Sequence, residues 1–299
     1  MADDSKLFQI NFWGVRGSIP CPGPETVRYG GNTPCVEIQV AGERIIFDGG
    51  TGLRVLGQSL LEQKIPVNAH LFFTHSHWDH IQGFPFFLPA FIKGNTLKIY
   101  GTIAPNGATI EQRLHDQMLH PNFPVPLQIM QGDLQFCDVE IGKPLNIGEA
   151  KIETAKLNHP GEAVGYRVSW QGASVAYVTD TEHYPDRLDE NVLSLANDAD
   201  VLIIDCTYTD EEYYDRNNSK VGWGHSTWQE AIKIAKAARV KQLVIFHHDP
   251  AHNDDFLDRI AEEAVAAFPN TIMAIEGRSI RLKPSNPSGK DPKPGKVLA

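Results

Sequence analysis

The sequence has few cysteines, no long apolar run and no recognisable leader. Its four cysteines, Cys21, Cys35, Cys137 and Cys206, are spread over 299 residues without a CxxC pair, so they predict reduced thiols and not a disulfide framework. No run of 18 apolar residues occurs, which argues against a membrane-spanning helix. The first residues lack a basic stretch followed by an apolar one, and we therefore expect a cytoplasmic protein without membrane association.

The chain also lacks the basic surplus that long nucleic acids require. It has 27 Lys and Arg against 37 Asp and Glu, a net charge of −10. Nonspecific affinity for nucleic acid comes mostly from Lys and Arg at the phosphates, so we expect no long nucleic-acid partner. Among its residues are twelve histidines, and these are unevenly placed.

The apolar pattern predicts an α/β protein. Helical periodicity predicts one helix at 108–119, one that begins after Thr227 and one at 253–268. Strands and helices interleave, which favours a mixed sheet with covering helices. The predicted strands are 7–12, 35–40, 44–47, 69–74, 96–100, 151–157, 164–170, 174–179, 201–204, 243–246 and 271–275.

We expect one folded domain over residues 1–282. Within it, the Pro- and Gly-rich segment near 101–144 reads as an insertion or lid. The last residues, 283–299, hold four Pro and four Lys with little to bury, and they predict a disordered tail.

Three histidines and a carboxylate follow the strand predicted at 69–74, in the sequence His75-Ser76-His77-Trp78-Asp79-His80. His75 and His77 alternate along an extended chain, whereas Asp79 and His80 stand where a helix would begin. Imidazole nitrogens and carboxylate oxygens suit Zn²⁺ or a similar ion. The alternative is a solvated loop that is His-rich by chance, and we favour the metal site.

Further candidate ligands stand at the ends of later strands. His159 follows the strand at 151–157, Asp180 ends that at 174–179 and His247 ends that at 243–246. Each alone could be a buried, hydrogen-bonded residue. Because strand ends converge on one rim of a sheet, their joint placement favours a shared site.

His75–His80 matches the HxHxDH motif of the metallo-β-lactamase superfamily, and His159, Asp180 and His247 stand in the order of that family's remaining ligands. The segment Phe47-Asp48-Gly49-Gly50-Thr51-Gly52 resembles the family's early Asp-Gly turn. The resemblance covers about residues 7–282. It implies an αββα sandwich, two mixed sheets flanked by helices, with a two-metal site in the groove between the sheets.

The resemblance also implies a role for each matching residue. Two divalent ions would be bound, Zn²⁺ first and Mn²⁺ as the alternative. One ion would be held by His75, His77 and His159, the other by Asp79, His80 and His247, and Asp180 would bridge them. Asp48 would support the ligands from behind, or else form a plain turn. His247 is preferred over its neighbour His248 because it directly continues the strand.

Two later segments resemble the phosphodiesterase branch of the family, which includes tRNase Z and cyclic-nucleotide phosphodiesterases. They are Asp205-Cys206-Thr207-Tyr208 and Gly222-Trp223-Gly224-His225-Ser226-Thr227. In that branch an acidic residue orients a histidine that protonates the leaving oxygen, which implies catalytic roles for His225 and Asp205 beside Asp79. Since tRNase Z usually has Glu at the position of Asp205, the shorter side chain predicts a long bond to His225.

The chain departs from tRNase Z in one interval. Asp180 follows His159 by only 21 positions, which two strands fill, whereas tRNase Z usually inserts a basic tRNA-gripping arm there. We therefore expect hydrolysis of a small cyclic phosphodiester, a 3′,5′-cyclic nucleotide first, to the nucleoside monophosphate. Alternatives are another phosphodiesterase or RNA-end nuclease of the branch, and, from another class, a non-catalytic module that sequesters cyclic nucleotides. Because relatives in this branch are often dimers, we expect a homodimer.

Several residues keep open roles. Most of the aromatic side chains in the stretch from Trp78 to Phe91 are expected in the core. Some of them could instead line a base-stacking pocket or form a dimer contact. His70 and His252 read as structural or surface residues. Roles at the substrate are left open for Arg16, Asn32, His115, His120 and His183, and His248 is left as a supporting or rim residue.

Overall fold

The computed structural model describes residues 7–284, which form two seven-stranded sheets. The first sheet has the order β14-β1-β2-β3-β4-β5-β6 and the second β13-β12-β11-β10-β9-β8-β7. The strands of the first are β1 (Phe8–Gly14), β2 (Cys35–Val40), β3 (Glu43–Phe47), β4 (Asn68–Phe72), β5 (Thr96–Gly101), β6 (Asp133–Asp138) and β14 (Ser279–Arg281). The strands of the second are β7 (Leu145–Ile147), β8 (Ala150–Leu157), β9 (Ala163–Trp170), β10 (Ala173–Val178), β11 (Val201–Asp205), β12 (Gln242–Phe246) and β13 (Thr271–Met273).

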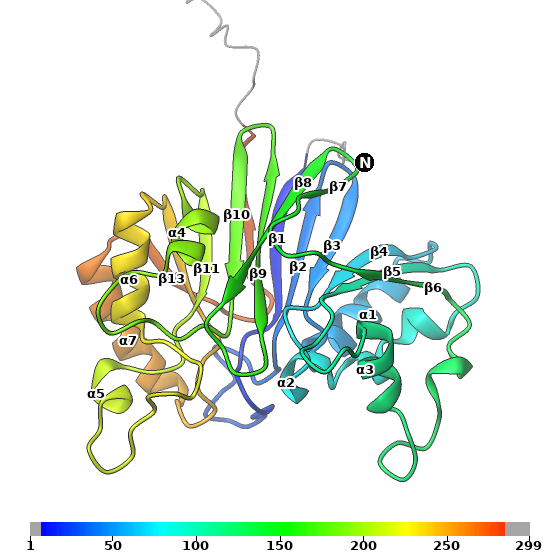
Figure 1. Cartoon of the computed structure of the whole chain (residues 1–299), viewed down its shortest axis with the longest axis horizontal. Coiled ribbons are helices and arrows are strands. Elements are labelled where there is room, and N and C mark those ends of the chain that lie inside the picture. Colours follow the sequence, from blue (N-terminus) through cyan, green and yellow to red (C-terminus); the bar gives the residue numbers. More distant parts are fainter. Residues whose placement is uncertain (1–6, 285–299) are drawn as a thin grey trace, which may run out of the picture.

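Helices cover the outer faces of both sheets. In Figure 1, α4, α6 and α7 lie on one side of the molecule and α1 and α3 on the other, with the sheets between them. The helices are α1 (Gly52–Glu62), α2 (Trp78–Ile81), α3 (Ile110–Asp116), α4 (Glu190–Ala196), α5 (Asp210–Tyr213), α6 (Trp228–Ala237) and α7 (Asp254–Ala267), with 3₁₀ turns at Phe84–Phe86, Leu88–Phe91 and Leu127–Ile129. None of these helices, within residues 7–284, is both long and apolar enough to cross a bilayer.

The central layer of the core lies between the two sheets. Phe47 of β3 packs on Tyr166 of β9 and Tyr177 of β10, with ring centroids 5.1 and 5.3 Å apart. All residues of β10 and β11 are buried, because helices cover one face of these strands and the other sheet covers the opposite face. This double burial explains why their sequences are almost entirely apolar, apart from Ser174 and the terminal Asp205. The αββα prediction is confirmed.

Parallel pairing aligns the strand ends that carry the candidate ligands. β3 is parallel to β4, and β10, β11 and β12 are parallel to one another. The carboxyl ends of each set therefore lie on one edge of their sheet. The residues at these ends are Asp48 after β3, His75 after β4, Asp180 after β10, Asp205 at the end of β11 and His247 after β12.

Every predicted strand is present, with shifts of one or two residues at some ends. The pattern missed β6, β7 and β14, as well as α1, α4 and α5. β6 pairs in parallel with β5, so the segment near 101–144 also contributes an edge strand to the first sheet. Of the predicted tail, only Lys283 and Pro284 belong to the part that the structure describes, and 285–299 lie outside it.

Candidate metal centre

The segment His75–His80 leaves β4 as extended chain and turns into α2. His77, immediately before the helix, has φ −63° and ψ 153°, which is extended backbone. The His75 ring lies 4.4 Å from the His77 ring and 4.3 Å from the His80 ring, measured between centroids. The change from extended chain to helix thus gathers three imidazoles, as the motif predicts.

The first group of donor atoms combines this motif with residues that follow β8 and β10. It consists of His75, His77, His159 and Asp180, whose ligand atoms all lie within 4.8 Å of one another. His159 Nε2 is 3.1 Å from His77 Nδ1. Asp180 Oδ2 is 3.6 Å from His75 Nε2 and 3.8 Å from His159 Nε2.

The second group combines the same motif with residues that follow β10 and β12. It consists of Asp79, His80, Asp180 and His247, again within 4.8 Å. His80 Nε2 is 3.3 Å from Asp79 Oδ2 and 3.2 Å from Asp180 Oδ1. His247 Nε2 is 3.3 Å from each of these two oxygens.

Asp180 belongs to both groups and turns one oxygen toward each. Oδ2 faces His75 and His159, whereas Oδ1 faces His80 and His247. Its backbone has φ +54°, a left-handed conformation that few residues other than glycine adopt. With one oxygen turned toward each group, this carboxylate could contact a cation in both.

The donor atoms fit divalent cations in both spacing and chemistry. Two ligands that each lie about 2.0–2.1 Å from a tetrahedral ion are roughly 3.3 Å apart, and the nitrogen–oxygen separations here are 3.2–3.8 Å. The buried His75 Nε2 has no hydrogen-bond partner among the described residues. An unpartnered nitrogen at the centre of such a cluster is expected of a metal ligand.

The protonation states of His75 and Asp180 also fit metal binding. Burial, together with the charge of nearby imidazoles, holds the pKa of His75 well below its usual value. Burial would raise the pKa of Asp180, but the facing His247, His80 and His75 hold it well below its usual range. Metals bind neutral imidazole and ionised carboxylate, which are the forms favoured here.

The negative charge around His80 also favours a bound cation. Burial would lower the pKa of His80, yet Asp180, Asp79 and Asp48 raise it well above its usual value. Three carboxylates therefore surround one buried ring. A divalent cation would balance this local excess of negative charge.

The second ring nitrogen of each buried candidate histidine contacts an oxygen, which fixes the ring. These contacts are His75 Nδ1 to Thr74 Oγ1 at 3.0 Å, His159 Nδ1 to Gly224 O at 2.8 Å, His247 Nδ1 to Thr207 Oγ1 at 3.0 Å and His80 Nδ1 to Asp48 Oδ2 at 2.9 Å. Such outer contacts orient metal-ligating imidazoles.

Asp48 is more than a turn former. Its carboxylate accepts hydrogen bonds from the Thr74 N–H at 2.8 Å and the Tyr177 hydroxyl at 2.9 Å, and it faces His80 from behind. Asp48 is fully buried. It thus joins both sheets to the centre, as expected for a residue that supports the ligands.

The partly buried His225 and the fully buried Asp205 form a pair beside both donor groups. His225 Nδ1 lies 2.7 Å from Asp205 Oδ2. The His225 ring is 5.3 Å from the His159 ring and 5.0 Å from the His247 ring, between centroids. The pair therefore stands next to the place where a phosphodiester would meet the metals.

The expectation of a long bond between Asp205 and His225 is wrong. Asp205 ends β11 with its carboxylate fixed by the Thr207 N–H and hydroxyl, at 2.9 and 2.7 Å. The loop that carries His225 is drawn in by a hydrogen bond from Tyr208 N to Ser226 O at 3.1 Å. Because the loop comes close, the shorter Asp side chain reaches the ring.

This pair sets the protonation of His225. Burial alone would lower its pKa, but the charge and hydrogen bond of Asp205 raise the pKa to about 9. The ring is therefore protonated at neutral pH with Nδ1 engaged, which leaves Nε2 as the nitrogen that can donate a proton.

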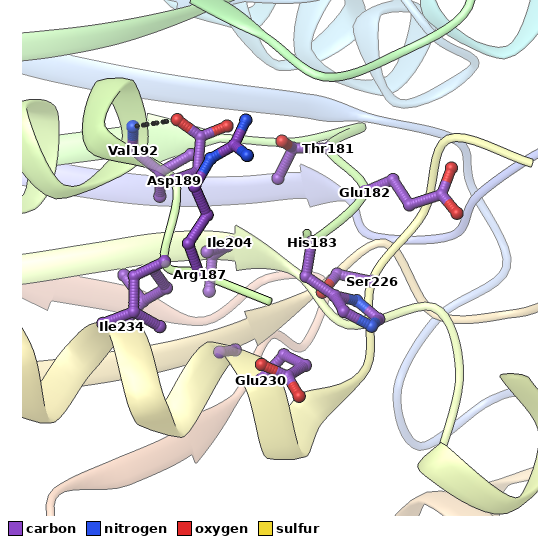
Figure 2. A pocket seen from close by; sticks show the side chains of 12 residues that line it. Thr181, Glu182, His183, Arg187, Asp189, Val192, Ile204, Ser226, Glu230 and Ile234 are labelled. Atoms are coloured by element: carbon purple, nitrogen blue, oxygen red, sulfur yellow. Dashed lines mark hydrogen bonds between the residues drawn. The ribbon is translucent and has the colours of Figure 1, made fainter. Parts of the chain in front are cut away.

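Sequence reasoning missed Glu182, which holds the loop before His225. Its carboxylate accepts hydrogen bonds from the N–H groups of Gly222 at 2.6 Å and Gly224 at 2.9 Å, and from the Tyr213 hydroxyl. Figure 2 draws Glu182 among the residues that line a neighbouring pocket, with its carboxylate directed away from His183 and Ser226. Since Gly224 O in turn contacts His159, Glu182 positions a candidate ligand. Its place two residues after Asp180 was the available signal.

Ser18 was also missed. Its N–H donates to Asp79 Oδ2 at 2.8 Å. A backbone donor leaves no mark in the sequence, because its position depends on how the chain before β2 folds over the centre.

Arg16 and Asn32 do not face the centre. Arg16 is fully buried and its guanidinium donates to the carbonyl oxygens of Gly30 at 2.8 Å and His252 at 2.6 Å. Asn32 donates through its side chain to Glu276 at 2.9 Å. Both residues therefore organise the loop between β1 and β2.

The remaining histidines lie outside the two donor groups. His248 is buried, contacts Ala274 O at 2.9 Å, and burial lowers its pKa to about 3. His183 lies between Ser226 Oγ at 3.1 Å and the Tyr214 hydroxyl at 3.2 Å. The others are His70 against Tyr100, His115 against Asp116, His252 against Glu212 and the exposed His120.

A family model described as "Beta-lactamase superfamily domain" matches residues 43–248, which include both donor groups. Among curated proteins, the chain is similar to "Ribonuclease Z" from Picrophilus torridus, with 26% identity over 316 residues that cover 91% of this chain and 95% of that protein. Because 91% of this chain is fewer than 316 residues, that relative has segments that this chain lacks.

Solved structures share the fold. The metallo-beta-lactamase fold protein YhfI from Bacillus subtilis matches with a TM-score of 0.69 and 22% identity, covering 92% of this chain and 99% of that chain. A diphosphatase from the PhnP family matches with a TM-score of 0.64 and 17% identity, covering 92% and 98%.

Proposed function

This chain belongs to the beta-lactamase superfamily, and we propose that it is a two-metal phosphodiesterase that hydrolyses a small cyclic phosphodiester, a 3′,5′-cyclic nucleotide first. The observation that carries the proposal is the His225–Asp205 pair, 2.7 Å apart and in ring contact with a residue of each donor group. A proton donor placed at the leaving oxygen accelerates the hydrolysis of a P–O bond.

The two donor groups would hold the cations, Zn²⁺ or Mn²⁺. His75, His77 and His159 would bind one, Asp79, His80 and His247 the other, and Asp180 both. When bound, the two ions would supply an activated water and positive charge opposite the phosphoryl oxygens.

The chain's own residues complete the reaction. His225, protonated and oriented by Asp205, donates the Nε2 proton to the departing ribose oxygen. We assign Asp79, whose Oδ2 is fixed by the Ser18 N–H, to orient the attacking water in addition to its role as a ligand. The product is a nucleoside monophosphate.

Two features favour a small substrate over a long one. The interval between His159 and Asp180 is filled by β9 and β10 and their short turn, so no arm extends from it. The net charge of −10 disfavours a polyanion that is bound through many phosphates.

The test is an assay of the purified protein with Zn²⁺ or Mn²⁺ against 3′,5′- and 2′,3′-cyclic nucleotides, with a chelator control. We expect conversion to nucleoside monophosphate that the chelator abolishes. No turnover across the panel would overturn the proposal. Nucleotide that binds and is recovered intact would instead indicate the sequestering module.

A second candidate is an RNA 3′-end nuclease. It is favoured by the 26% identity with a Ribonuclease Z over 91% of this chain. The same assay should therefore include short RNAs and a folded tRNA precursor. A higher kcat/KM on RNA than on every cyclic nucleotide would select this candidate.

We also propose that the protein is a homodimer and that it is located in the cytoplasm. All four cysteines are unpaired in the structure, as expected in a reducing compartment. Light scattering of the purified protein tests the dimer, for which the measured mass should be twice that of the chain.

A further inference from the structure

The helix that carries Asp79 and His80 presents a tryptophan to solvent. Trp78 is 82% exposed, more than any other large hydrophobic side chain in the described part of the chain. In the same aromatic-rich stretch, Phe84 and Phe87 are fully buried. Core packing thus accounts for these two rings and leaves Trp78 unexplained.

Trp78 borders an open pocket of about 570 Å³, which we call the α2–α3 pocket. This volume lies within the range of small-molecule sites. Ser76 and Trp78 are the chain neighbours of His77, so the pocket lies beside the segment that carries this member of the first donor group. Its lining residues are Ser76, Trp78, Ile81, Gln82, Arg113, Asp116, Gln117 and Asn122.

The lining of the pocket also includes an unused hydrogen-bond donor. Gln117 Nε2 is buried and has no hydrogen-bond partner among residues 7–284. A buried amide donor is unfavourable unless an acceptor reaches it. It therefore suits a ligand that brings an acceptor on its edge.

The cation of this lining, Arg113, already uses its N–H groups within the protein. The Arg113 guanidinium donates to Ser76 Oγ at 3.2 Å, to Thr109 O at 3.3 Å and to Thr102 O. The charged part of a substrate would therefore lie at the metal centre, and the exposed face of Trp78 favours a flat ring in the pocket.

We propose that the α2–α3 pocket binds the nucleobase of the substrate, with Trp78 stacked on the ring and Gln117 donating a hydrogen bond to its edge. The inference rests on the proposed function, because it assumes that the phosphodiester lies at the adjoining metal centre. Stacking on an aromatic side chain is tolerant of base identity, whereas a side-chain donor at the edge discriminates between bases.

The test compares a cyclic nucleotide with ribose 3′,5′-cyclic phosphate, which has the same reacting group and no base. Trp78→Ala should lower kcat/KM for the nucleotide by about fivefold or more, mainly through KM, and leave the base-free substrate unchanged. Trp78→Phe should restore most of the loss. Gln117→Glu, which replaces the donor with an acceptor, should change the order of preference among bases.

Phe86→Ala is the matched control. Phe86 is 52% exposed in the same stretch and is not part of the pocket wall, so its loss should affect neither substrate. Equal losses in Trp78→Ala and Phe86→Ala, with a change in oligomeric mass, would show that the surface is a contact between copies, and would overturn the pocket.

Binding separates this inference from the proposed function. Calorimetry with nucleoside monophosphates should show at least about fivefold weaker binding to Trp78→Ala than to the wild type. If cyclic nucleotides are not hydrolysed but this difference remains, the proposed reaction fails and the base site stands. If Trp78→Ala binds and turns over nucleotides as the wild type does, the base site is wrong.

Discussion

At the scale of single residues, His225 and Asp180 separate proton transfer from metal binding. His225→Ala removes the proton donor without removing a ligand, so kcat should fall by about 10²- to 10⁴-fold while metal content stays unchanged. Asp180→Ala removes an oxygen from both donor groups and should lose metal and activity together. Elemental analysis beside turnover measures both. Full activity in His225→Ala would exclude its role as the acid.

The pH dependence follows from Asp205. Because this carboxylate raises the pKa of His225 to about 9 against the effect of burial, the donor is protonated below that value, and activity should decline as pH rises through it. In Asp205→Asn the pKa falls, so the decline should begin at lower pH. A kcat–pH profile of both proteins measures the shift; identical alkaline limbs would contradict the assignment.

The candidate ligands, which the structure brings together, could be picked out from the sequence because each is a titratable side chain in a motif or at a strand end. Asp48, His75, Asp180 and His247 could be placed in this way. For Glu182 the sequence offers only its closeness to Asp180, since two of its partners are backbone N–H groups of a loop about 40 positions away. The short bond between Asp205 and His225 depended on loop position, which side-chain length alone does not fix.

At the scale of elements, the loop between β1 and β2 packs directly against His247 of the second donor group. A Cβ on Gly17 would lie 2.4 Å from Cε1 of His247, so Gly17→Ala must displace that ring. We expect about one metal equivalent per chain instead of two. Gly23→Ala is the control, because a Cβ there meets nothing within 4 Å. Two equivalents retained in Gly17→Ala would argue against His247 as a ligand.

The elements that the sequence pattern missed are those with mixed or interrupted apolar sequences. β6 reads DLQFCD with alternating partial exposure, because it is an edge strand that helices cover only in part. α1 begins at Gly52 and contains Gly57, which approaches Phe87 too closely for a Cβ. Tertiary packing, which local propensity does not encode, decides both.

At the scale of the whole molecule, the metals would tie the two sheets together. The first sheet supplies His75 to His80 through β4, and the second supplies His159, Asp180 and His247. Chelation should therefore destabilise the protein. If each cation stabilises the fold by about 2.7 kcal/mol at a hundredfold excess over Kd, removal of both should lower Tm by roughly 10 °C or more. Thermal melts with a chelator, followed by added Zn²⁺ or Mn²⁺, measure this; an unchanged Tm would contradict it.

Several residues at the centre have a left-handed backbone conformation, which would affect the outcome of engineering for stability. Of the ten non-glycine residues with positive φ in the described chain, Ser18, Asp48, Asp180 and His247 contribute directly to the centre or its support. Each conformation costs on the order of 1 kcal/mol, which glycine would relieve. A screen for thermostability alone, run without metal, would therefore enrich glycine at these positions and discard the enzyme's chemistry. At these positions, selection for thermal stability and selection for catalytic activity would favour different residues.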